Sequence, residues 1–340
     1  MTSRELVRKT LEFENTEWRA PREMWALPWA GIHHGKALDA IRERFPDDFF
    51  SPDPCYAKLG AAHGDPYKKG RYTDQWGCAF EMFEDGYIGE VKTPLVGDEN
   101  WEDARLVRFP EGELSVDADQ VNAQCRASDK FTRAPVSPNP FERLQFIRTT
   151  EALYCDLTNP PGGLLAFIQK LHTFYCDVMQ LWAKTDVDAL NIFDDWGSQN
   201  ALLINPETWR RLFKPLYKDY ADIAHKAGKK IFMHSDGYTL AIYPDLIEIG
   251  IDAFNSQLFC MGIENLAKYR GKITFWGEID RQNLLPYATP GEIAASVRAV
   301  REALWLNGGA IAQCEFGVGS KPENVSAVYE TWNTYGKDIT

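Results

Sequence analysis

The chain has 340 residues, a formal net charge of −12 and a hydrophobic content of 44%. This length allows one large domain or two ordinary domains, and the acidic balance argues against the basic surface that a nucleic-acid-binding protein needs. No apolar run approaches the roughly 20 residues that span a bilayer, and the N-terminus lacks a signal-peptide core. We therefore expect a cytoplasmic protein that binds neither nucleic acid nor membrane.

Hydrophobic periodicity and turn signals predict a mixture of helices and strands before residue 187. The expected elements are helices at 3–13, 37–45, 117–127, 141–148, 151–157 and 162–184, and strands at 22–29 and 131–136. A loop at 31–35 carries His33 and His34, which we interpret as solvated. Short antiparallel strands around the turn at 85–86 predict an insertion at about 50–115 that covers the main body. Because no linker-like segment separates these parts, 1–340 is expected to form a single domain.

From residue 187 the pattern becomes regular, with five buried strands that alternate with helices. The strands are expected at 189–193, 230–233, 251–254, 273–275 and 310–312, and the helices at 206–226, 239–248, 263–269, 290–306 and 322–335. Strands joined by helical connections are parallel, and with the earlier strands their number approaches eight. The predicted fold is therefore a (β/α)8 barrel with its mouth covered by the insertion, and a doubly wound open sheet is the alternative.

Polar residues follow each of the five strands at its C-terminal end. They are Asp194 and Asp195, His234 and Asp236, Asn255 and Gln257, Glu278 and Asp280, and Cys314 and Glu315. In a barrel these ends converge on one mouth, where the active site lies. Solvation alone does not explain five such ends, since the rest of each strand is apolar. The pattern predicts an enzyme.

The pair formed by His234 and Asp236 is central to this mouth. Side chains two residues apart on a strand share a face, so the imidazole and the carboxylate are expected to point the same way. Such a pair serves metal ligation or proton transfer. A core histidine that is hydrogen-bonded by its neighbour is the alternative.

Several segments also carry a family likeness. They are residues 2–7, DQWG at 74–77, FDDWG at 193–197, FMHSDG at 232–237, FWGEID at 275–280, and Cys314 with KPENV at 321–325. In these segments the chain resembles the uroporphyrinogen decarboxylase superfamily, which contains the haem-pathway decarboxylase and zinc-dependent, corrinoid-linked methyltransferases. The resemblance covers nearly the whole length and implies a (β/α)8 barrel.

The first strand separates the two branches of this superfamily. In the decarboxylase it leads into an arginine-rich loop that binds the acidic side chains of a porphyrinogen. Here the corresponding stretch runs from Trp25 to Trp29 without an arginine, although buried carboxylates need compensating cations. The chain is thus more similar to the methyltransferase branch, and an apolar or aromatic substrate is expected.

The methyltransferase branch holds zinc through a histidine and two cysteines in the pattern H-x-C…C. The resemblance implies His234, Asp236 in place of the first cysteine, and Cys314 as ligands, with Glu278 as a further one and Asp194 or Asp195 orienting the histidine. Without a metal, His234 and Asp236 would be an acid–base pair and Cys314 a buried thiol.

This resemblance implies a methyltransferase that moves a methyl group from a small methylated compound, such as an aromatic methyl ether, to a corrinoid on a partner protein. The side chains expected to take part in the chemistry are Asp194, Asp195, Asp236 and Glu278. Those expected to bind substrate are Trp25, Trp29, Trp196, Asn255, Gln257 and Trp276, although core filling is the alternative for each tryptophan. A metal-free decarboxylase using the aspartates, and a non-catalytic corrinoid- or porphyrin-binding protein, are the other hypotheses. A homodimer is compatible with the sequence.

Overall fold

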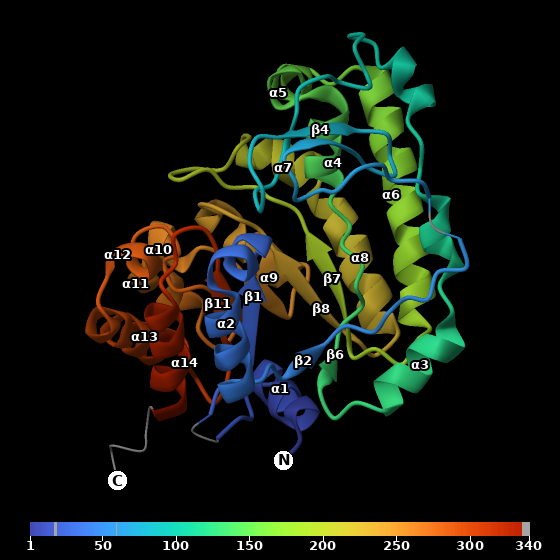
Figure 1. Cartoon of the computed structure of the whole chain (residues 1–340). Helices are drawn as coiled ribbons and strands as arrows, with labels where there is room; N and C mark the ends of the chain where they lie inside the picture. The colour runs from blue at the N-terminus through green and yellow to red at the C-terminus, as the bar shows by residue number, and fades with distance from the viewer. Residues whose placement is uncertain (17–18, 59, 335–340) are drawn as a thin grey trace.

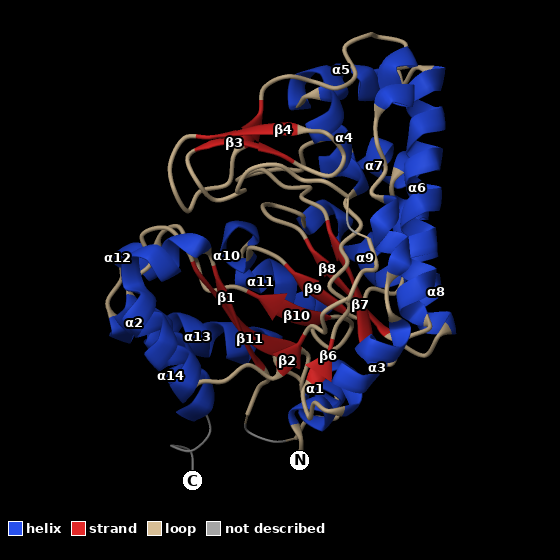
Figure 2. Ribbon diagram, turned by 45° about the vertical axis from the view of Figure 1, so that its right-hand side comes forward, coloured by secondary structure: helices blue, strands red, loops and turns tan. Residues whose placement is uncertain are grey.

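The computed structural model describes residues 1–16, 19–58 and 60–334 (Figure 1). Its centre is a curled sheet of six parallel strands, which Figure 2 shows in red. In hydrogen-bonded order these strands are β1 (Arg22–Ala26), β11 (Ala310–Phe316), β10 (Thr274–Gly277), β9 (Ala253–Asn255), β8 (Lys230–His234) and β7 (Ala189–Phe193). All five pairings are parallel. Polar strand ends far apart in sequence are therefore brought to one rim.

Two short parallel strands, β2 (Phe49–Phe50) and β6 (Phe131–Thr132), complete the ring. Arg133 forms a parallel bridge with Ala189 at the edge of β7. At the other edge the backbone N–H of Asp48 donates to the carbonyl of Arg22 at 2.9 Å. The barrel is thus confirmed, and the open sheet is excluded because both edges of the six-stranded sheet are hydrogen-bonded to this pair. Sequence patterns had not located β2, which has only two residues.

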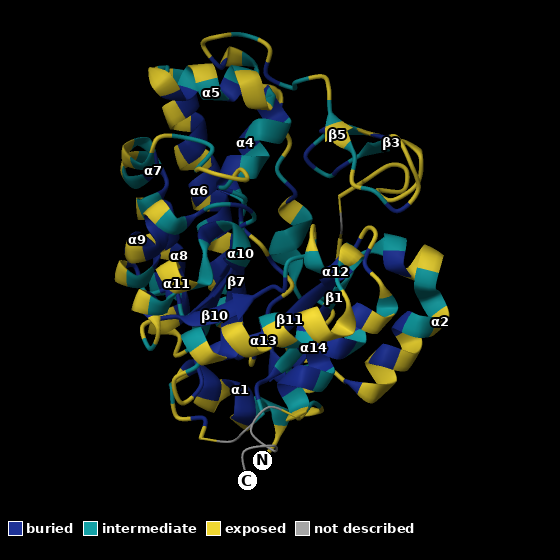
Figure 3. Ribbon diagram, turned by 90° about the vertical axis from the view of Figure 1, so that its left-hand side faces the viewer, coloured by how far each residue is buried: buried dark blue, intermediate teal, exposed yellow. Residues whose placement is uncertain are grey.

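Helices form the outer layer around the strands (Figure 1). They are α1 (Ser3–Leu11), α2 (Pro28–Arg44), α3 (Ala118–Arg126), α4 (Pro140–Arg148), α5 (Thr150–Thr158), α6 (Gly162–Ala183), α7 (Pro206–Leu212), α8 (Lys214–Lys226), α9 (Tyr243–Glu248), α10 (Leu258–Met261), α11 (Ile263–Leu266), α12 (Leu284–Tyr287), α13 (Pro290–Leu304) and α14 (Pro322–Thr334). Buried residues gather on the strands and on the inward faces of these helices (Figure 3). No described helix is both long and apolar enough to cross a membrane.

The largest differences between predicted and observed helices are at the start of α2 and within 206–226. The loop expected at 31–35 is part of α2, which begins at Pro28 and is kinked at His34, where φ is −135° and ψ is 28°. Proline suits the first helical turn because a backbone N–H there would have no acceptor within the helix, so its absence costs no hydrogen bond. The single helix expected at 206–226 is divided into α7 and α8, because Pro215 cannot donate a backbone hydrogen bond and restarts the helix.

The interior of the barrel is filled by side chains that alternate along the strands. Phe49, Phe232, Trp276 and Ile311 pack together there, and Val7 of α1 packs against them from below. Among these apolar groups lies a buried ion pair between Arg133 and Glu23. The Trp276 indole N–H donates to the second oxygen of Glu23 at 2.8 Å, and the Arg133 guanidinium stands 4.5 Å over the Trp276 ring. This layer is the closed floor beneath the mouth.

The insertion between β2 and β6 contains a three-stranded antiparallel sheet. Its strands are β3 (Gly70–Thr73), β4 (Ala79–Met82) and β5 (Glu90–Val91), and it lies above the strand ends beside α4 and α5 (Figures 1 and 2). The turn between β4 and β5 reaches α2 on the opposite side. Gly86 has φ +86°, and a Cβ there would lie 3.1 Å from the Trp29 Cα. A glycine is needed at this contact because both its conformation and the available space exclude a side chain.

Candidate active site

His234, at the end of β8, is the best-defined side chain of the mouth. Parallel pairing places it opposite Phe193 on one side and Asn255 on the other. The Asn255 side-chain N–H group donates to the carbonyl of Trp276, so its Oδ1 is free to accept from His234 Nδ1 at 2.7 Å. This contact fixes the tautomer, since Nδ1 must carry a proton to donate. Nε2 then faces the carboxylates of the mouth.

Two aspartates flank His234 Nε2. The Oδ1 atom of Asp195 lies 3.3 Å away and that of Asp236 lies 3.7 Å away. Asp195 Oδ1 also accepts from the backbone N–H of Asp236 at 2.7 Å, which ties the loop after β7 to the loop after β8. The side chains of Asp195 and Asp236 are 34% and 30% exposed, so the group opens to the mouth rather than lying sealed in the core.

The three side chains meet the requirements of a metal site. One ligand atom each from Asp195, His234 and Asp236 lies within 4.8 Å of the others. Asp236 Oδ1 is buried and has no hydrogen-bond partner among the described residues, whereas buried carboxylate oxygens are normally paired. One nitrogen and two oxygen ligands are a donor set that a divalent ion such as zinc accepts, with coordination positions left for substrate or water.

The same contacts shift the pKa values of this group. Burial lowers the pKa of His234, but the hydrogen bond and negative charge of Asp195 outweigh it and raise the value to about 10. For the Asp195 carboxyl group burial has the opposite effect and raises the pKa. The hydrogen bond and charge of His234 outweigh it and bring the pKa of Asp195 below its ordinary value. With no metal bound, the pair is therefore an imidazolium–carboxylate pair at neutral pH.

Arg281 joins three acidic side chains of the rim. Its guanidinium contacts Asp236 Oδ2, lies 2.7 Å from a Glu315 oxygen and 3.5 Å from Glu278 Oε1. The adjacent Asp280 instead accepts from backbone N–H groups of its own loop, those of Gln282 at 2.9 Å and Asn283 at 2.8 Å. Glu278 is 2% exposed. Its burial and the charges of Asp236 and Glu315 raise the pKa of Glu278 to about 8, because they outweigh the opposite effect of the Arg281 charge. Arg281 thereby fixes Asp236 with Oδ1 turned toward His234.

Glu142 is a member of the mouth that sequence analysis did not identify. Its backbone N–H is bound by Asp194 at 2.8 Å, and its carboxyl group interacts with Asp195, Asp194 and His234. Burial and the two aspartates raise its pKa well above the ordinary value. No motif marks this residue, because it lies on a helix rather than at the end of a strand.

Comparisons with known proteins show the family of the chain. The family model described as uroporphyrinogen decarboxylase (URO-D) matches residues 74–335, which includes the C-terminal ends of all the barrel strands except β1 and β2. The chain belongs to the uroporphyrinogen decarboxylase family. No curated protein matches the sequence.

Solved structures resemble this member of the family in fold. A methyltransferase from Methanosarcina mazei matches with a TM-score of 0.69 and 12% identity, over 98% of this chain and 99% of that one. A B12-independent methionine synthase from Shewanella sp. W3-18-1 matches with a TM-score of 0.45 and 12% identity, over 95% of each chain. An endo-beta-1,4-xylanase from Gloeophyllum trabeum has a TM-score of 0.45 and 11% identity, over 95% and 98%. At 11–12% identity, these likenesses concern the fold alone.

Cys314 is not placed with His234 in this family member. Ile311 belongs to the cluster inside the barrel, whereas Ala312, Cys314 and Phe316 belong to the other core cluster, which also contains the buried residues of the outer helices. Because side chains alternate along β11, the thiol points away from the mouth while Gln313 and Glu315 point into it. Cys314 is fully buried, and burial raises its pKa well above the ordinary value. The metal-ligand role expected for Cys314 is therefore corrected to that of a buried core thiol.

The carboxylate of Asp194 is also directed away from the His234 ring. It accepts from the backbone N–H groups of Phe141 and Glu142 at 2.9 and 2.8 Å and from the Tyr217 hydroxyl at 2.6 Å. It is fully buried and holds the first turn of α4. The proton-transfer role expected for Asp194 is replaced by a positioning role, because all its oxygens face outward from the barrel toward α4 and α8.

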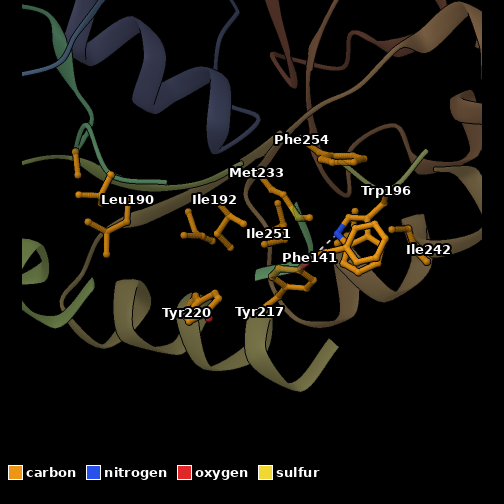
Figure 4. Close-up of a cluster of buried hydrophobic side chains, with 14 of the residues drawn as sticks. Phe141, Leu190, Ile192, Trp196, Tyr217, Tyr220, Met233, Ile242, Ile251 and Phe254 are labelled. Carbon is orange, nitrogen blue, oxygen red and sulfur yellow. Dashed lines mark hydrogen bonds between the residues drawn. The ribbon is translucent and has the colours of Figure 1, made fainter. Parts of the chain in front are cut away.

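The four tryptophans expected to bind substrate divide into two groups. Trp25 is partly exposed, and its ring lies 5.2 Å from the His234 ring and 5.7 Å from that of Phe193, centroid to centroid. Trp29, on α2, stacks on His33 at 4.4 Å. Trp196 and Trp276 are fully buried. Figure 4 shows Trp196 stacked on Phe141, with which its centroid distance is 4.0 Å. The substrate-binding role is thus corrected for Trp196 and Trp276, which fill cores.

The two amide side chains predicted at the mouth hold neighbouring residues of the mouth in place. Asn255 orients His234, as described above, and is fully buried. Gln257 Oε1 accepts from the backbone N–H of Gly237 at 3.0 Å, which fixes the loop that carries Asp236. Gln257 also lines a small cavity of about 30 Å³ with Glu278 and Arg281. Only Gln257 is thus placed to reach a ligand directly.

Replacing Asp194 with alanine is expected to lower the free energy of unfolding by about 2–4 kcal/mol, because two backbone N–H groups and a buried hydroxyl lose their acceptor. Urea denaturation would measure this loss. Metal content should stay at the level of the parent, since the Asp194 carboxylate bonds Phe141, Glu142 and Tyr217 rather than the His234 ring. Loss of metal with unchanged stability would instead place Asp194 in the reaction centre.

Proposed function

We propose that this chain is a methyltransferase that moves a methyl group from a small methylated compound, such as an aromatic methyl ether, to the cobalt of a corrinoid on a partner protein. The observation that carries the proposal is the arrangement of His234 Nε2 between Asp195 and Asp236 Oδ1, beside the open ring of Trp25. Asp195, His234 and Asp236 would hold a zinc ion. Bound there, zinc supplies a Lewis acid that stabilises negative charge developing on a leaving oxygen.

The remaining side chains of the mouth have separable tasks in this reaction. Trp25 and Phe193 offer aromatic surfaces for the flat body of a substrate. Arg281 and Asn255 hold Asp236 and His234 in place. Glu278 is buried, and its Oε1 has no hydrogen-bond partner among the described residues, which favours it as the carboxyl group that gives a proton to the departing oxygen. The carbon–oxygen bond breaks and a carbon–cobalt bond forms, with the electron pair supplied by Co(I).

Charge argues against a porphyrinogen as the substrate. A substrate with many carboxylates needs several cations at its site. In the described part of the mouth, Arg281 is already paired with three acidic side chains, and Arg133 lies below, paired with Glu23. Trp25 occupies the end of the first strand. The electrostatics therefore favour an uncharged substrate.

A second candidate is a lyase that decarboxylates another acid by proton transfer without a metal. The contact of His234 with Asp195 favours it, because an imidazolium held by a carboxylate is a proton donor in its own right. This activity would be insensitive to chelators, whereas the methyltransferase would lose its zinc and its rate together.

The experiment that separates the two functions uses purified protein with Co(I) cobalamin and a panel of methoxylated aromatics. Methyl transfer is expected to consume the Co(I) absorbance and to stop after dialysis against a chelator, with recovery on adding zinc. A decarboxylase would instead release carbon dioxide from an acid substrate and leave the cobalamin spectrum unchanged. Full transfer activity in chelated protein would contradict the zinc site.

A further inference from the structure

A cavity of about 520 Å³ lies at the end of the barrel opposite the mouth. It is bordered by α1 and α3, which Figure 1 shows at the end away from the insertion, and by the residues just before β7 and at the start of β8. Lys230 is the first residue of β8 and His234 the last, so about 13 Å separates this end from the mouth at about 3.3 Å per residue. The cavity is therefore a space apart from the candidate active site.

Positive charge collects around this cavity, although the chain as a whole has a formal net charge of −12. Two of the lining cations have a carboxylate beside them, since Arg126 lies 3.0 Å from Asp186 and Lys230 lies 3.5 Å from Glu12. The other lining cations surround a single carboxylate, that of Asp188. They are Arg4, Arg8 and Lys229. Three cations around one carboxylate leave an excess of about two positive charges at this place.

Contacts with residues 185–188 bring the three cations together. Arg4 Nε and Arg8 Nη2 lie 3.0 and 2.5 Å from the two oxygens of Asp188. Lys229 Nζ donates to the backbone carbonyls of residues 185 and 187 at 2.6 and 2.7 Å. Burial lowers the pKa of Lys229, Asp188 opposes this shift, and the positive charge of Arg8 adds to it. The cations thus act on one another across the same space, and a bound anion would relieve their repulsion.

Arg8 is the cation that the fold itself needs least. Asp188 already accepts from the backbone N–H and the hydroxyl of Thr132 at 2.8 and 2.9 Å, and from Arg4. The Arg8 side chain is 56% exposed, and its Nε and Nη1 make no hydrogen bond with the described residues. Lys229 has three N–H donors and gives two of them to carbonyls. Accessible donors therefore remain for a ligand with several acceptor oxygens.

The size of the charge excess favours a doubly charged anion. A phosphoryl group carries between about 1.5 and 2 negative charges at pH 7, and arginine binds its oxygens in a bidentate way. A carboxylate or a sulfate ester carries a single charge and would leave one cation without a counter-ion. The carbonyls of Cys125, Thr185 and Val187 do not oppose an anion at this end, because they already accept from Arg4 and Lys229.

We propose that this cavity is a second binding site, for a phosphoryl group supplied by free phosphate or by a small phosphate monoester, with Arg4, Arg8 and Lys229 as the donors. The volume lies within the roughly 300–1,000 Å³ of small-molecule pockets, so there is room for an organic group beside the phosphoryl oxygens. Binding there is noncovalent and does not depend on methyl transfer. The inference goes beyond the proposed function and is tested without a corrinoid or a metal.

Isothermal titration of the full chain with phenyl phosphate is the test, with phenyl sulfate as the matched probe. Phenyl sulfate keeps the ring and the three terminal oxygens but carries only one negative charge. One phenyl phosphate per chain is expected, with phenyl sulfate bound at least about tenfold more weakly, a difference of about 1.4 kcal/mol. Absence of saturable phenyl phosphate binding, or equal binding of phenyl sulfate, would overturn the proposal.

Inorganic phosphate distinguishes the two sources of the phosphoryl group in the same titration. Tighter binding of phenyl phosphate than of inorganic phosphate would support an organic phosphate as the ligand. Equal or tighter binding of inorganic phosphate would support free phosphate.

Three variants locate the binding. Arg8→Gln should weaken phenyl phosphate binding about tenfold or more by removing a charged donor, and it should fold because Asp188 keeps its bonds to Thr132. Lys218→Ala removes a cation from the exposed face of α8 and should leave binding unchanged, as should His234→Ala at the other end of the barrel. Unchanged affinity in Arg8→Gln, or loss in His234→Ala, would place the phosphoryl group elsewhere and refute the assignment. Equal losses in Arg8→Gln and Lys218→Ala would show general charge attraction and refute it as well.

Discussion

His234→Ala is expected to release the bound metal and to lower methyl-transfer activity by more than about 100-fold. The change removes the only nitrogen among the three candidate ligands and leaves Asp195 and Asp236 facing each other without a cation between them. An orienting partner of a metal ligand typically contributes about 10–100-fold. Asn255→Ala should therefore give the smaller loss, since it removes only the hydrogen bond that sets the tautomer. Metal content by mass spectrometry and the initial rate measure both effects.

Cys314→Ala is the matched control for this prediction. The thiol is buried on the outer side of β11, so the variant should keep its metal and its rate while losing a little stability, about 1 kcal/mol. The opposite result, with metal lost in Cys314→Ala and retained in His234→Ala, would show that the site described by Asp195, His234 and Asp236 is wrong. Equal metal content in all variants, including His234→Ala, would also refute it.

Glu23→Ala is expected to lower the free energy of unfolding by about 3–5 kcal/mol, because it leaves the Arg133 guanidinium buried without its counter-ion. Both side chains of this ion pair are 8% exposed, and Trp276 loses its hydrogen-bond acceptor as well. Urea denaturation of the purified variant measures the loss.

A surface ion pair provides the comparison for the Glu23 prediction. Lys218 and Asp222, one turn apart on α8, are 47% and 37% exposed, and Asp222→Ala should cost no more than about 0.5 kcal/mol. Equal losses in the two variants would mean that Arg133 finds another partner or water when Glu23 is removed. Glu23→Gln should fall between them, since it keeps an acceptor for Trp276 but not the charge.

The sequence by itself determined the barrel and the residues at its rim. Regular alternation of strands and helices after residue 187 requires parallel strands, and parallel strands place all their C-terminal ends at one edge. Residues two apart on one strand share a face, so His234 and Asp236 could be placed together without a structure. The sequence also showed directly that tryptophan, and not arginine, stands at the end of the first strand.

Only the tertiary structure decided which rim residues face the mouth. Strands in a barrel are buried on both faces, so an apolar run does not show which alternate residues point inward. Cys314 and Asp194 were placed at the mouth for this reason, although their side chains face the helices. Long-range packing also brought in Glu142 from a helix, and it drew Arg281 to Asp236 rather than to its neighbour Asp280. Ring closure fixed β2, because two residues carry no periodicity of their own.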